Sequence, residues 1–199
     1  MKNRFIPFLC VGVLLLLGCF LAKPKQTLAR IPATHFQLRS LEAVNLSEDM
    51  SPVSTKADEV FLQVDLVRKE ATRFERKTIL QSSFNCSEKK RRIDLSLAYK
   101  LHDPKADYLV FSLVELDERN SEAKVQQVLG EGVTQGLFLS QDHFFQIDSL
   151  LGDDDFLGMQ FLNLSTSYFV GKDYLTIAGR QLFDRFEYRL HYQWKVVTE

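Results

Sequence analysis

From Asp58 onward, hydrophobic and polar residues alternate with a period of two in several short stretches. The segments "VFLQVDL" (60–66) and "IDLSLAYKLH" (93–102) each place their apolar residues on one face of an extended chain. Such alternation is typical of a β-strand that buries one face and exposes the other. The segment "DYLVFSLVEL" (107–116) is almost continuously apolar, which predicts a central strand.

The carboxyl-terminal segment "FEYRLHYQWKVV" (186–197) alternates over the longest stretch and is rich in aromatic residues. Its apolar row is expected to pack against a facing sheet. "HFFQIDSL" (143–150) and "FLGMQFLNL" (156–164) are shorter strand candidates. One short helix is expected within 172–185, while 119–140 fits either a hairpin or a helix followed by a strand. These elements predict an all-β fold, an antiparallel β-sandwich of about eight strands.

The amino terminus has the pattern of an export segment. Two basic residues, Lys2 and Arg4, precede an uncharged apolar run of 18 residues, 5–22. A basic start, an apolar run and a small-residue exit are typical of a secretory signal. Three outcomes remain open: cleavage after Ala29, lipidation of Cys19 in the lipobox-like "LLGC", or retention as an uncleaved anchor, because 18 residues just span a bilayer.

Composition and charge divide the chain into three parts. We expect a signal peptide or membrane anchor at 1–29, a polar tether at 30–57, and a β-sandwich domain at 58–199 with an insertion near 118–152. The first part carries four of the 25 basic residues and no acid, which leaves 21 basic against 26 acidic residues in the remainder. This excess of acid argues against nucleic-acid binding, which requires clustered positive charge.

Few residues carry recognisable chemistry. The sequence contains no Gly-x-Ser-x-Gly elbow, no His-Glu-x-x-His motif and no phosphate-binding glycine loop. Cys86 is the one cysteine outside the apolar run, so it has no partner for a disulfide within the exported part. The basic cluster 89–92, "KKRR", fits a solvated turn or a contact with acidic lipid headgroups.

The acidic run at Asp153–Asp155 is the strongest candidate for ligand binding. Calcium prefers several oxygen ligands, which carboxylates supply. The segment "DDDFLGMQFLNL" (153–164) resembles the last calcium loop and following strand of C-two domains, and "LVFSLVELDE" (109–118) resembles their strand that ends in Asp-x-Asp.

This resemblance implies an eight-stranded calcium- and lipid-binding sandwich that holds metal in loops at one end. Asp117 and either Asp154 or Asp155 would be the matching ligands, with Glu115 in place of the first aspartate. The residues between the two segments would then be an insertion.

We therefore expect an exported, non-catalytic binding module, secreted, periplasmic or membrane-anchored at the cell envelope, with calcium as a candidate stabilising ion. Its partner would be an unknown protein or the envelope or membrane surface. The alternative is a secreted enzyme with its site in the 118–152 insertion.

Overall fold

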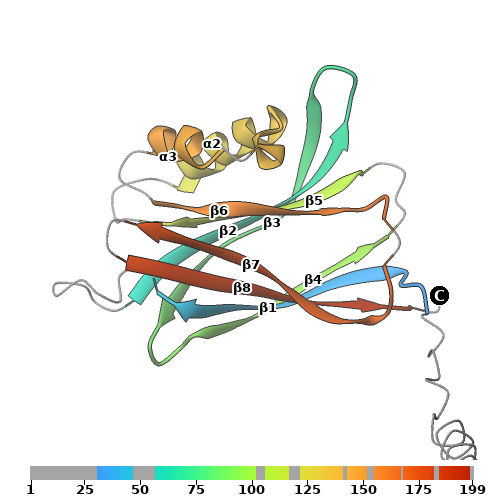
Figure 1. Ribbon diagram of the computed structural model, residues 1–199, viewed down its shortest axis with the longest axis horizontal. Helices are drawn as coiled ribbons and strands as arrows, with labels where there is room; N and C mark the ends of the chain where they lie inside the picture. Colours follow the sequence, from blue (N-terminus) through green and yellow to red (C-terminus); the bar gives the residue numbers. More distant parts are fainter. Residues whose placement is uncertain are drawn as a thin grey trace, which may run out of the picture. The chain divides into compact units, whose positions relative to one another are not determined.

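In the computed structural model, two antiparallel four-stranded sheets pack face to face (Figure 1). The structure describes residues 31–46, 57–101, 106–116, 122–140, 143–151, 155–166, 168–181 and 184–197. The first sheet has the order β4-β1-β8-β7 and the second the order β3-β2-β5-β6. The strands are β1 (His35–Asn45), β2 (Ala57–Lys69), β3 (Phe74–Ser87), β4 (Arg92–Lys100), β5 (Tyr108–Glu115), β6 (Asp155–Asn163), β7 (Gly171–Gln181) and β8 (Asp184–Lys195). The expected β-sandwich of about eight strands is confirmed.

The main hydrophobic core lies between the two sheets. It is built from alternate positions of the strands, as the period-two pattern predicted. Phe36 of β1 occupies its centre and contacts the rings of Phe111, Tyr192 and Trp194, with centroids 5.3 to 5.9 Å apart. Because each buried aromatic side chain contributes about 1.5–3 kcal/mol, this cluster is a major source of stability.

A helical segment between β5 and β6 covers the outer face of the second sheet. It contains α2 (Glu122–Thr134), the short 3-10 helix η1 (Leu137–Leu139) and α3 (His143–Leu151). Figure 1 shows these helices as a third layer above β5 and β6. Buried residues of α2 and η1, among them Leu129 and Phe138, form a second core with Val110 and Val114 of β5. Since β5 is covered on both faces, its sequence is apolar except for Ser112 and the terminal Glu115.

The region near 118–152, expected to be an insertion, contains these helices, and "HFFQIDSL" is α3 and not a strand. In α3, Ile147 and Leu151 lie four positions apart and are both buried, which is helical spacing. Alternation over so short an apolar run does not separate a helix from a strand.

Two further expectations were wrong. The expected tether at 30–57 contains β1, which pairs with both β4 and β8. A bulge between Leu38 and Ser40 shifts the inward positions by one residue, so strict alternation is lost in the sequence. The helix expected within 172–185 is instead β7, an edge strand whose sequence pattern is weak because most of its side chains are exposed.

Candidate functional site

The structure brings together two of the four candidate metal ligands. Glu115 ends β5 and Asp155 begins β6, and the two residues lie directly opposite each other in the ladder. Glu115 is buried and Asp155 is half-buried. Asp117 and Asp154 lie outside the described residues, as does Cys19. The described part of the proposed site is therefore one facing pair of carboxylates at this end of the sandwich, which we call the acidic end.

The acidic end contains a third carboxylate that was not among the predicted metal ligands. Asp58 near the start of β2 is fully buried, and Tyr188 of the opposite sheet donates a hydrogen bond from its hydroxyl to Asp58 Oδ2. Asp58 is also close to Glu115, because Glu115 pairs with Val60 two positions along β2. The sequence pattern indicated this position: Asp58 lies two residues before Val60, so both side chains are on the inward face of the strand.

Burial, together with the charge of Asp58, raises the pKa of two side chains at the acidic end. The pKa of Tyr188 is raised far above its ordinary value, first by burial and then by the charge of Asp58. The pKa of Cys86, which pairs with Asp58 across the ladder, is raised to about 11, again chiefly by burial. Both side chains are therefore protonated at neutral pH, and Cys86 is a poor nucleophile.

The described carboxylates do not complete a metal site by themselves. Within the described ranges, no group of three or more His, Cys, Asp or Glu side chains is arranged to hold a metal ion. A calcium site of the expected composition would need oxygens from Asp117 and Asp154, since calcium takes ~6–8 ligands.

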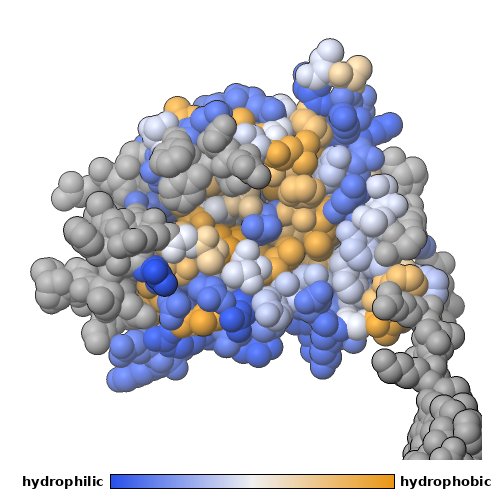
Figure 2. All heavy atoms as spheres, in the orientation of Figure 1, coloured by the Kyte–Doolittle hydropathy of each residue, from blue (hydrophilic) through white to orange (hydrophobic). Residues whose placement is uncertain are grey.

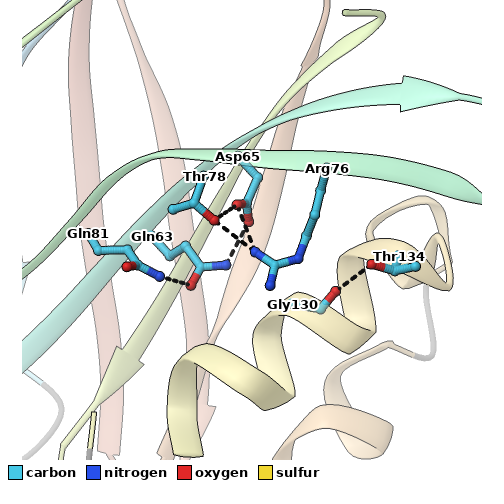
Figure 3. A network of polar contacts seen from close by, with 7 residues as sticks. All are labelled: Gln63, Asp65, Arg76, Thr78, Gln81, Gly130 and Thr134. Carbon is cyan, nitrogen blue, oxygen red and sulfur yellow. Dashed lines mark hydrogen bonds and ion pairs between the residues drawn. The ribbon is translucent and has the colours of Figure 1, made fainter. Parts of the chain in front are cut away.

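A second polar cluster lies between β2, β3 and α2 (Figure 3). Asp65 of β2 is fully buried and accepts hydrogen bonds from Gln63 Nε2 at 2.6 Å, Thr78 Oγ1 at 2.5 Å and Arg76 Nη1 at 3.3 Å. Gln81 Nε2 donates to Gln63 Oε1 at 3.0 Å and extends the network along β3. Burying a carboxylate is costly unless it is paired and hydrogen-bonded, so these donors are what keeps Asp65 stable under the helical layer.

The guanidinium group of Arg76 fits under α2 because residue 130 is a glycine. A Cβ atom at Gly130 would lie 2.1 Å from Arg76 Nη2 and 2.5 Å from Arg76 Cζ. Figure 3 shows the Arg76 side chain reaching from β3 toward this turn of the helix. Gly130, which is costly inside a helix, is thus required here by a close side-chain approach.

A hollow of about 260 Å³ opens beside this contact. Its lining consists of Arg76, Gln127, Gly130, Glu131, Thr134 and Gln135. Several of these groups already bond within the protein: Arg76 to Asp65, Gln127 to Glu131, and Thr134 to the carbonyl of Gly130. The lining contains no nucleophile with an adjacent base, which acyl or glycosyl transfer would need.

The basic cluster 89–92 spans the turn between β3 and β4 and the first residue of β4, Arg92. Lys90 and Ser87 exchange backbone hydrogen bonds of 3.0 and 3.2 Å across this turn. Arg91 Nη1 donates to the carbonyl of Val44 on β1 at 2.5 Å. Arg91 therefore links the turn to β1 of the first sheet, while Lys89 and Lys90 are exposed.

No protein-family model and no curated protein sequence matches the chain significantly. Among solved structures, the chain is similar to the C-two domain A of a plant extended synaptotagmin, with 15% identity and a TM-score of 0.39. The match covers 85% of this chain and all of that domain. The similarity is distant.

Proposed function

We propose that this chain is an exported, non-catalytic β-sandwich module that its amino-terminal segment holds at the cell envelope, where the sandwich binds a surface or a protein. The observation that carries this proposal is the short distance along the chain between the apolar run and the folded sandwich. Ile31 is already fixed by a hydrogen bond from Val170 N to its carbonyl at 3.0 Å. Only residues 23–30 separate it from the run that ends at Ala22, a span of at most about 30 Å.

Cell fractionation of the full chain tests this proposal. We expect the protein in the membrane fraction, resistant to a high-salt wash, because burial of the apolar run or of an acyl chain does not depend on salt. Cys19→Ser should release it only if Cys19 carries a lipid, and Cys10→Ser is the matched control in the same run. Recovery of the unaltered full chain in the cytosol would overturn the proposal.

We further propose that the acidic end binds calcium, using Glu115, Asp117, Asp154 and Asp155. The facing pair Glu115 and Asp155 supports this proposal, since hard cations prefer carboxylate oxygen. Calcium at about 100 times its dissociation constant should stabilise the fold by about 2.7 kcal/mol, visible as a raised melting temperature.

Asp154→Asn and Asp155→Asn should abolish the calcium-dependent rise, whereas Asp94→Asn on the exposed face of β4 should retain it. If millimolar calcium produces no rise in the unaltered protein and no heat in calorimetry, the calcium site is refuted. The proposed role as a binding module would be unaffected by that result.

A further inference from the structure

Five exposed apolar side chains gather at the end of the sandwich where the described chain begins. We call them the apolar end patch; they are Ile31, Phe169, Val170, Val196 and Val197, each between 39% and 61% exposed. Figure 2 shows orange atoms at this end, close to the point marked C in Figure 1. A contiguous group of exposed apolar residues marks a surface for interaction.

Backbone contacts hold the apolar end patch in a fixed arrangement. Pro32 and Phe169 form an isolated β-bridge, and Val197 N donates to Thr34 Oγ1 at 3.1 Å. Beneath the patch, the rings of Tyr168 and Trp194 are stacked with centroids 3.9 Å apart. The apolar side chains are thus presented on an ordered platform that joins both ends of the described chain.

Basic residues flank the patch on the outer face of the first sheet. Lys100 of β4 and Lys195 of β8 pair with His35 of β1 from either side. Lys172 is the second residue of β7 and pairs with Gln193 of β8. Among the residues that the structure describes, Asp173 is an acid on the same strand as Lys172, and its Oδ1 accepts a hydrogen bond from Tyr174 N. Apolar side chains bordered by lysines suit a membrane interface, where alkyl groups enter the headgroup boundary and ammonium groups meet lipid phosphates.

We propose that the apolar end patch docks onto the lipid surface of the membrane to which the chain is attached, an inference that rests on the proposed function. The path of the chain favours lipid over a protein partner, because the eight residues 23–30 lead from the patch directly to the apolar run. A tether this short keeps the patch at high effective concentration beside the bilayer, so weak apolar contacts suffice.

This docking orients the rest of the sandwich. Strand β6 runs from Asp155 at the acidic end to Asn163 near the patch, a length of about 30 Å at the rise of a strand. The exposed Lys89 and Lys90 lie in the β3–β4 turn, at the same end of the sandwich as Asp155. Ser87 at the end of β3 pairs with Ala57 at the start of β2. Three positions further along β2, Val60 pairs with Glu115, which in turn pairs with Asp155. Docking by the patch therefore directs the acidic end and the basic turn away from the lipid.

The single tryptophan of the chain, Trp194, is a natural probe of this arrangement. The full chain is reconstituted into phosphatidylcholine and phosphatidylglycerol vesicles that carry a spin-labelled lipid with its quencher at the headgroup boundary. We expect about twofold quenching of Trp194 emission relative to vesicles without spin label, since docking brings the indole to within several ångströms of that boundary.

Substitutions separate docking from attachment. Val170→Asp combined with Val197→Asp should reduce the quenching to near zero while the chain still floats with the vesicles. Leu150→Asp is the matched control, because Leu150 of α3 is 55% exposed and lies outside the patch; it should leave the quenching unchanged. Addition of a calcium chelator should also have no effect.

Three results would overturn the inference while leaving the proposed function intact. The first is a vesicle-bound chain whose Trp194 is not quenched. The second is quenching that survives Val170→Asp with Val197→Asp but is lost on Lys89→Glu with Lys90→Glu or on calcium chelation. The third is a loss of Trp194 quenching as the protein concentration rises, which would show that a second copy covers the patch. Failure of the chain to float with vesicles would refute the proposed function itself.

Discussion

Replacing Gly130 by alanine should destabilise the protein, although alanine is the better helix former. The new Cβ would occupy the position of the Arg76 guanidinium, whose Nη2 lies 2.1 Å from the ideal Cβ site. Arg76 is the flexible partner in this contact, so its side chain has to move outward into the hollow. That movement breaks its contacts with Asp65 and Thr78.

The size of the effect follows from these contacts. Arg76 Nη1 lies 3.3 Å from Asp65 Oδ1 and 2.7 Å from Thr78 Oγ1. Hydrogen bonds to charged groups contribute about 1.5–3 kcal/mol, and we take about 2 kcal/mol because Asp65 retains its other donors and the Arg76 side chain is 29% exposed. Alanine in a helix is more favourable than glycine by about 1 kcal/mol. Gly130→Ala should therefore lower the free energy of unfolding by about 1 kcal/mol.

A double-mutant cycle with Arg76→Ala makes this argument specific. Without the guanidinium, the Cβ at position 130 meets no obstacle, and only the helix propensity remains. Gly130→Ala should then raise the free energy of unfolding of the Arg76→Ala variant by about 1 kcal/mol. The sign of the effect reverses between the two backgrounds, with a coupling of about 2 kcal/mol.

Chemical denaturation of the four proteins measures this cycle, and the melting temperature should change by about 2–4 °C per kcal/mol. Gly132→Ala is the control on the same helix. Its Cβ would meet Ile147 Cδ1 at 3.1 Å and not Arg76, so its effect should be equal in both backgrounds. If Gly130→Ala changed the free energy of unfolding in the same direction in both backgrounds, the contact with Arg76 would not be the cause of its effect.

Two further predictions concern the acidic end. Because the pKa of Cys86 is raised to about 11 from 9.0, the folded protein retains this proton longer than the unfolded chain, and stability should fall as pH rises from about 9 to 11. Denaturation at pH 7.5 and 10.5 should show a smaller loss for Cys86→Ala than for the unaltered chain; an equal loss would contradict this cause. Tyr188→Phe removes the donor to buried Asp58 and should cost about 1–3 kcal/mol, whereas Tyr174→Phe, on an exposed ring, should be neutral.

Most strands of this sandwich were predictable because their pattern is local. In β2, β4 and β8 the inward residues recur at every second position, since one side of each strand meets the core between the sheets. The expectation failed where local pattern and tertiary setting differ. A bulge obscured β1, exposure at a sheet edge obscured β7, and the helix α3 was too short to be told from a strand.

The candidate sites were only partly visible for a related reason. The acidic run and Glu115 stand out in the sequence, and Asp58 has the parity of an inward position. The donor from Tyr188, in contrast, comes from the opposite sheet and carries no sequence signal of its own. The need for glycine at position 130 is likewise invisible, because it arises from an arginine on another element.

The sequence by itself determined the class of fold and the end of β5 and β6 at which carboxylates gather, and it predicts an export segment at the amino terminus. These features depend on hydrophobicity and on the two-residue repeat of a strand, which are properties of short segments. Only the tertiary structure decided which residues meet across the sheets, which helix covers Asp65, and that Ile31 joins Phe169 and Val197 in one exposed patch. Such contacts are made between distant segments when the sheets close, so no local pattern specifies them.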